Sequence, residues 1–196
     1  MSAKEDLRVK RTKKALGEAF VALLNEKPFD EITVNELCLR ADVRRATFYK
    51  HYSDKFDFLA AFTRAIRRQF DTLIWKYEKP EPTKDYYVEY AKHVVEFICE
   101  HTKAVRNIYT SNLFPSVLSI IIEENYKDTC ERLERSVAAG LKLNASIEVT
   151  AAMCAGGVSA TIFAWLSTGM TLSADELALQ VGNIVSAVIE EKKSAE

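Results

Sequence analysis

Hydrophobic residues recur every three or four positions along most of the chain, which is the spacing that gathers them on one face of an α helix. The first run predicts a helix over residues 4–25 that ends before Pro28, and its apolar members are Leu16, Ala19, Phe20, Leu23 and Leu24. Later runs predict helices over residues 53–78, 86–101, 103–110, 115–139, 146–168 and 173–192. With two short helices described below, the pattern predicts an all-α fold of about nine helices.

A pair of short helices joined by a tight turn is predicted between Thr33 and His51. Thr33 with Glu36 three residues later forms a capping box, which predicts where the first short helix begins. Asp42 occupies the turn, where a left-handed backbone is needed and Asp tolerates it. The second helix then extends from about Arg44 to His51. This layout is typical of a helix-turn-helix, whose second helix enters the DNA major groove.

The second short helix separates its side chains by face. Phe48 and Tyr52 are four residues apart and are expected to pack inward, while most of the other side chains are basic or polar. Arginine can bind guanine edges with two hydrogen bonds, and lysine, histidine and tyrosine can hold phosphates. The spacing alone leaves two interpretations open, a DNA-reading helix and a solvated basic helix.

The segment TVNELCLRADVRRATFYKHYSDKFDFL resembles the DNA-binding signature of TetR/AcrR-family transcriptional regulators, over about residues 8–62. The resemblance implies an all-helical, dimeric protein, usually a repressor that a small ligand releases from its operator. By position, the residues that it places near bases are Asn35, Arg45, Ala46, Thr47 and Tyr49. Those that it places near phosphates are Thr33, Lys50, His51 and Lys55.

One position departs from the family pattern. Many members have Ser where this chain has Arg44, so the usual N-cap of the recognition helix is lost. We expect Arg44 to bind a base or a phosphate instead.

The charges are distributed unevenly along the chain. Residues 1–70 hold 15 Lys and Arg against 10 Asp and Glu, whereas residues 71–196 hold 12 against 18. A basic first third suits a polyanionic partner and the acidic remainder does not. We therefore predict a helix-turn-helix DNA-binding domain over residues 1–54, with a connecting helix from about residue 53. Residues 55–196 form the predicted helical effector-binding and dimerisation domain.

The last two predicted helices have the composition of an interface. Small residues follow each other every four positions in the first of them, and apolar residues form a face on the second. The predicted interface consists of Ala152, Gly156, Ala160, Ala164, Leu177, Val181, Ile184, Val185 and Val188. Two copies would form a four-helix bundle, although the same residues could simply close the core of one chain. A twofold dimer implies a near-palindromic operator.

A small-molecule effector is implied by the resemblance, and the sequence scarcely locates its pocket. Candidate wall residues are Phe97, Tyr109, Phe114, Tyr126, Met153 and Trp165. The alternative is that these side chains are ordinary core. The composition fits an apolar or aromatic effector best.

Other classes of protein are disfavoured by what the sequence lacks. None of the three histidines follows a glutamate by three residues, and there is no Gly-rich phosphate loop or nucleophile elbow, so we expect no enzyme, metal or cofactor. The four cysteines form no CxxC pair and are expected to be buried thiols of a cytoplasmic protein.

Two alternatives remain beside a cytoplasmic DNA-binding regulator. Residues 149–174 are uncharged and long enough to span a bilayer, but they lack basic flanks, so we favour a buried helix. A few proteins with this fold act as coactivators or adaptors through protein partners; the basic first third argues for DNA instead.

Overall fold

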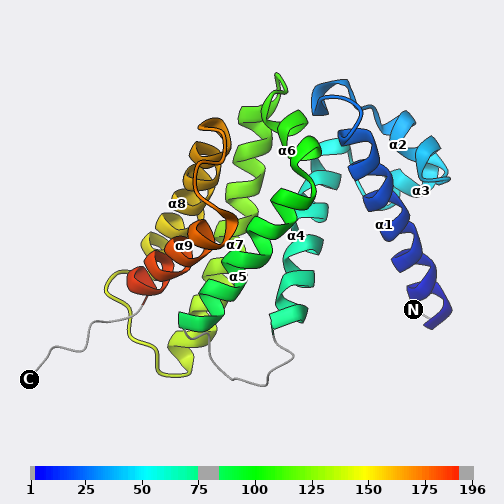
Figure 1. Cartoon of the computed structure of the whole chain (residues 1–196). Coiled ribbons are helices and arrows are strands. Elements are labelled where there is room, and N and C mark those ends of the chain that lie inside the picture. Colours follow the sequence, from blue (N-terminus) through cyan, green and yellow to red (C-terminus); the bar gives the residue numbers. More distant parts are fainter. Residues whose placement is uncertain (1–2, 75–83, 190–196) are drawn as a thin grey trace, which may run out of the picture. The chain divides into compact units, whose positions relative to one another are not determined.

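The computed structural model describes residues 3–74 and 84–189, and these residues form nine α helices and one short 3-10 helix without any strand (Figure 1). The predicted all-α class is therefore confirmed. The helices are α1 (Ala3–Leu24), η1 (Phe29–Glu31), α2 (Val34–Arg40), α3 (Arg45–Tyr49), α4 (Lys55–Ile74), α5 (Lys84–Glu100), α6 (Thr102–Tyr109), α7 (Phe114–Ala138), α8 (Ile147–Ser167) and α9 (Ala174–Ile189).

Several helix ends lie where local chemistry predicts them. The Ser146 hydroxyl accepts a hydrogen bond from the Val149 amide and caps α8. Ser173 and Glu176 form a second capping box ahead of α9. Gly140 and Gly169, which end α7 and α8, have positive φ values of 108° and 81°. The predicted ends of the connecting helix near residue 78 and of the last helix near residue 192 lie outside the described residues.

The chain divides into two compact units, one of Met1–Phe62 with Glu100–Ile120 and one of Thr63–Cys99 with Ile121–Glu196. The sequence gives no sign that α6 and the start of α7 belong with the N-terminal helices. The boundary predicted between residues 54 and 55 stays a prediction.

Aromatic side chains form the core of the first unit. Phe20 of α1 is 1% exposed, and its ring meets three others edge to face, those of Phe29, Phe58 and Phe62, at centroid distances of 6.0, 5.3 and 5.3 Å. Phe58 also contacts Phe48 of α3 at 5.9 Å. Because edge-to-face pairs add to the stabilisation from burial, this cluster holds α1, η1, α3 and α4 together.

The second unit combines an apolar core with a charged network. Its core includes Tyr87, Leu133, Ala151, Cys154 and Ile189, from α5, α7, α8 and α9. Beside it, ion pairs join α4 to α7: Arg67 binds Asp128, and Arg132 binds Asp71 at 3.1 Å. Arg67 is 9% exposed, and its ion pair with Asp128 offsets the cost of burying the guanidinium.

Close contact between α5 and α9 requires the glycine at position 182. A methyl group there would lie 2.5 Å from the Val88 Cα and 2.8 Å from the Val88 nitrogen, and backbone atoms cannot move aside cheaply. We expect Gly182→Ala to lower the free energy of unfolding by about 1–3 kcal/mol, because the two helices must separate.

Gly157→Ala in α8 is the matched control for that variant. A methyl group at position 157 meets nothing within 4 Å, so alanine should leave stability unchanged or raise it by up to about 1 kcal/mol through helix propensity. Urea unfolding of both variants measures the difference. Equal stabilities for the two variants would show that α5 and α9 do not pack closely at this point.

Among the helices of the described residues, α8 is long and apolar enough by composition to cross a membrane. Only 33% of its most apolar window is buried inside the chain. α8 is therefore buried over part of its surface, and apolar side chains such as Met153 are exposed on the rest.

Candidate nucleic-acid interface

The first helix of the helix-turn-helix begins as its sequence predicts. The Glu36 amide donates to the Thr33 hydroxyl at 3.2 Å, and the Thr33 amide donates to the Glu36 carboxylate at 3.1 Å. These two bonds complete the predicted capping box. Ile32 and Leu37 on either side of it are buried.

The turn between α2 and α3 is a Schellman motif with aspartate at its left-handed position. Asp42 has φ of 52°, as expected. The Val43 amide donates to the Cys38 carbonyl at 2.9 Å, and the Asp42 amide donates to the Leu39 carbonyl at 3.3 Å. This geometry fixes the direction in which α3 leaves the turn.

The second helix, α3, is shorter than the predicted segment. It contains five residues, Arg45–Tyr49, and its N-cap Arg44 makes no side-chain capping bond. Beyond Tyr49 the His51 amide donates a hydrogen bond to the Phe48 carbonyl at 2.9 Å, and Lys50 and His51 form a turn. Phe48 and Tyr52 are buried, which confirms the inward face.

The side chains predicted to approach bases belong to α2, to the N-cap of α3 and to α3 itself. Asn35, Arg44, Arg45, Ala46 and Tyr49 are exposed, and Thr47 is half-buried. Tyr49 is 48% exposed, although its ring rests on buried Phe48 at 5.4 Å. The Arg45 guanidinium lies 5.8 Å from the centroid of the same ring. The buried Phe48 ring therefore positions Tyr49, and the Tyr49 ring in turn restrains the Arg45 side chain.

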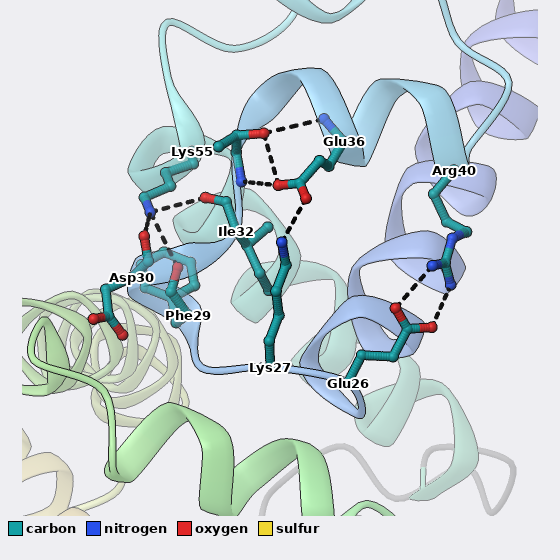
Figure 2. Close-up of polar contacts among 9 residues, drawn as sticks. Glu26, Lys27, Phe29, Asp30, Ile32, Glu36, Arg40 and Lys55 are labelled. Carbon is teal, nitrogen blue, oxygen red and sulfur yellow. Dashed lines mark hydrogen bonds and ion pairs between the residues drawn. The ribbon is translucent and has the colours of Figure 1, made fainter.

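The residues predicted near phosphates differ in their exposure and in the hydrogen bonds that they already make within the chain. Lys50 is exposed and His51 is half-buried. The Thr33 hydroxyl is held within the capping box, where it also donates to Glu36 at 2.8 Å. The Lys55 ammonium donates to the backbone carbonyls of Phe29, Asp30 and Ile32 at 3.0, 3.2 and 2.9 Å (Figure 2).

Ion pairs that the sequence analysis missed fasten α2 to the segment after α1. Arg40 binds both carboxylate oxygens of Glu26 at 2.8 Å, and Lys27 binds Glu36 (Figure 2). The partners are 14 and 9 residues apart, so no helical spacing relates them. The exposed Arg40–Glu26 pair adds little stability, but its two-pronged geometry helps to orient α2.

A second set of polar contacts ties the end of α1 and the segment after it to α6 and to the loop between α6 and α7. Asp30 accepts hydrogen bonds from the Ser111 hydroxyl at 2.7 Å and the Asn112 amide group at 2.8 Å. These two donors lower the pKa of Asp30. The Asn107 side chain donates to the Leu24 carbonyl at 2.7 Å, at the end of α1.

The capping box predicts a pH dependence. Hydrogen bonds from Lys27, then from the Thr33 hydroxyl and amide, lower the pKa of Glu36 from 4.5 to about 2. Because the folded pKa lies below the ordinary one, the ionised carboxylate stabilises the fold above pH 4.5, and this stabilisation is lost as the pH falls to about 2. We expect Glu36→Gln to be less stable than the natural chain at neutral pH.

The difference between the two chains should shrink as the pH falls from 4.5 to about 2, and denaturant unfolding at a series of pH values measures it. Glu18→Gln is the control, since Glu18 is exposed and pairs only loosely with Lys14 at 3.7 Å. A Glu36→Gln deficit of constant size across the whole pH series would contradict the assignment.

The predicted effector residues are divided between the two units. The rings of Tyr109 and Phe114 lie edge to face in the first unit, with their centroids 6.3 Å apart. In the second unit, Phe97 lies 5.9 Å from Phe70, and Tyr126 is partly buried against the core. The Trp165 indole is buried and donates to the Leu172 carbonyl at 2.9 Å, whereas Met153 is 62% exposed. The position of the pocket stays a prediction.

The predicted dimer residues separate into exposed and inward-facing groups. Ala152, Ala160 and Ala164 are exposed along α8, and Gly156 is half-buried. On α9, Ile184 is 64% exposed and Val185 and Val188 are half-buried, whereas Leu177 and Val181 are buried inside the chain. The exposed apolar side chains that the sequence analysis missed are Val149, Phe163, Leu172 and Leu179.

Comparison with known proteins finds relatives of this helix-turn-helix segment. Residues 18–62 match the family model of bacterial regulatory proteins, tetR family. Over 55 residues the chain is 44% identical to the uncharacterized HTH-type transcriptional regulator YxbF of Bacillus subtilis (strain 168). That match covers 28% of this chain and 14% of the relative.

Solved structures share the fold over nearly the whole chain. A TetR-family transcriptional regulator, described as putative, from Syntrophomonas wolfei has a TM-score of 0.66 at 14% identity, covering 95% of this chain and 99% of that one. The SmeT–triclosan complex has a TM-score of 0.60 at 15% identity and covers 94% of each chain. Residues 18–62 therefore match the tetR family of bacterial regulatory proteins, and the chain as a whole shares its fold with a solved structure described as a TetR-family regulator.

Proposed function

We propose that this chain is a cytoplasmic transcriptional regulator that reads a specific DNA duplex with α3. One observation supports the proposal above all: Arg45 and Tyr49 stand exposed and paired on a helix that buried Phe48 anchors in the core. A guanidinium can bind a guanine edge with two bonds, and the tyrosine can contact a phosphate or a thymine methyl group. Exposed Lys50 beside them suits the phosphate backbone.

The exposed apolar face of α8 and α9 supports a second part of the proposal, a homodimer. α8 and α9 lie side by side (Figure 1). Small residues on α8 allow close approach of another helix, and Met153 and Ile184 provide large apolar side chains on the same two helices. A second copy would cover both surfaces in a four-helix bundle. Two α3 helices related by a twofold axis would then read a near-palindromic operator.

Regulation by a small effector is the third part of the proposal. We infer that the chain is a repressor and that an apolar or aromatic compound releases it from DNA. The structural neighbour SmeT is a complex with triclosan, and the second unit of this chain has half-buried aromatic rings, such as Phe97 and Tyr126. Titrating triclosan into the operator complex is a first probe, with dissociation of DNA as the expected result.

Selection of bound duplexes from random DNA tests the function itself. We expect the enriched sequences to contain two inverted half-sites with centres separated by about 34–36 Å or a multiple of it. Affinity for the selected duplex, called the operator below, should fall steeply with salt, because phosphate contacts release counterions. A chain that enriches no sequence and binds no duplex at low salt would refute the proposal and favour an adaptor that acts through protein partners.

A further inference from the structure

We propose that Lys55 is a positioning residue for DNA recognition: its ammonium fastens the segment Phe29–Ile32 to the start of α4 and makes no contact with DNA phosphate. The proposal rests on the proposed function, since it concerns how the helix-turn-helix is held in shape to read DNA. It replaces the phosphate contact that the family resemblance implies for this lysine.

The three donors of the lysine are all used within the chain. An ammonium has three N–H groups, and the Lys55 ammonium donates to the carbonyls of Phe29, Asp30 and Ile32 at 3.0, 3.2 and 2.9 Å. Figure 2 shows the side chain reaching into the curve of this segment, where the three oxygens converge on its nitrogen. A phosphate oxygen could bind the ammonium only by displacing one of these carbonyls.

Aromatic rings enclose the same ammonium. It lies 4.7 Å from the centroid of the Phe29 ring and 5.9 Å from that of Phe56. Phe29 is fully buried, so this side of the ammonium faces the core. Burial lowers the pKa of Lys55, with the nearby Asp30 carboxylate opposing the shift. The side chain is half-buried, in contrast to the exposed Lys50.

The fastened segment determines where α2 begins. Ile32 directly precedes Thr33, the N-cap of α2, so the bond from Lys55 to the Ile32 carbonyl lies next to the capping box. Lys55 is itself the first residue of α4. One side chain therefore joins the starts of η1, α2 and α4.

A positioning role and a phosphate contact predict different salt dependence. Each phosphate contact contributes about 0.9 to the slope of log affinity against log salt concentration. We expect Lys55→Met in the full-length chain to lower operator affinity by about tenfold or more while leaving the slope unchanged, because misplacement of a recognition element weakens binding without removing a counterion. The matched control Lys50→Met should lower the slope by about 0.9.

Hydrogen exchange provides a readout that does not depend on DNA. In Lys55→Met, amides of residues 29–36 should exchange about tenfold faster or more, whereas Lys50→Met should leave them unchanged. If the natural chain binds no duplex, the proposed function fails and the exchange result alone decides the role of Lys55. A slope lowered by about 0.9 with unchanged exchange in Lys55→Met would overturn the proposal.

Lys55→Arg covers the case in which the methionine variant does not fold. Arginine binds phosphate at least as well as lysine, so a phosphate contact would survive this change. A planar guanidinium cannot present three donors from one atom to three converging carbonyls. We therefore expect Lys55→Arg to bind the operator about tenfold more weakly with an unchanged salt slope, and full operator affinity would overturn the proposal.

Discussion

Arg45→Ala and Tyr49→Ala should each remove specific operator binding and leave the fold and the oligomeric state intact. A well-placed base contact contributes about 1–3 kcal/mol of discrimination, which corresponds to roughly five- to more than a hundredfold in affinity. Arg45 and Tyr49 also order each other, since the guanidinium lies over the tyrosine ring. Each substitution therefore removes one contact and loosens the other. Operator affinity should fall close to the affinity for unrelated DNA, in fluorescence anisotropy at fixed salt.

Arg135→Ala is the control for the loss of one positive charge. Arg135 is exposed near the end of α7, in the acidic part of the chain. Its removal should leave operator affinity within about twofold of the natural chain, because Arg135 belongs to the other unit and an exposed charge that does not touch DNA is screened by salt. Circular dichroism should give the same helical content for all three variants. Normal operator affinity in Arg45→Ala or Tyr49→Ala would refute the role assigned to that residue.

Ile184→Glu combined with Met153→Glu should convert the dimer into monomers. The two side chains are among the most exposed apolar residues of the second unit, at 64% and 62%. In an interface each new carboxylate would lose its hydration, which costs several kcal/mol and outweighs the apolar contact that it replaces. Without the dimer, the second half-site is no longer bound at high effective concentration. Operator affinity should therefore fall by about a hundredfold or more.

Leu73→Glu is the matched control, since Leu73 is a further exposed apolar residue, at the end of α4. Sedimentation velocity should give a dimer for the natural chain and for Leu73→Glu, and a monomer for the double variant. A natural chain that is monomeric at micromolar concentration would refute the homodimer. A natural chain that stays in solution only with detergent would indicate that a membrane covers α8.

The sequence was sufficient for the helix-turn-helix because its determinants are local. Thr33 and Glu36 are three residues apart, and a capping box needs only that spacing. Asp42 adopts the left-handed conformation that the turn demands. Phe48 and Tyr52 are four residues apart, as the inward-facing positions of a helical turn are, and both are buried. The exposed surface that we propose to read DNA follows from these few positions.

The role of Lys55 could not be predicted in this way. Its acceptors are backbone carbonyls that lie 23–26 residues earlier, and backbone oxygens leave no pattern in a sequence. The Glu26–Arg40 pair joins two segments whose approach depends on the loop after α1. Spacing along the chain does not report such contacts between separate segments.

The face of α9 was difficult to assign for a different reason. Apolar residues occur on both sides of this helix, so helical periodicity does not decide which side meets the core. The structure buries Leu177 and Val181 and exposes Leu179 and Ile184. In this helix the choice of face is made by tertiary packing, for example the close approach of Gly182 to Val88.

The contacts of Asp30 and Leu24 with α6 and with the loop between α6 and α7 bear on any attempt to shorten this protein. The matched segment ends at residue 62, yet the unit that contains it also includes Glu100–Ile120. A fragment cut after residue 62 would lack Asn107, Ser111 and Asn112, and the groups that they bind would lose these partners. The unit that contains the helix-turn-helix is built from two separate stretches of sequence. It therefore cannot be expressed as one continuous fragment that keeps all of its stabilising contacts. A chimera that joins this helix-turn-helix to another effector-binding domain needs a replacement for the contacts that Glu100–Ile120 provides.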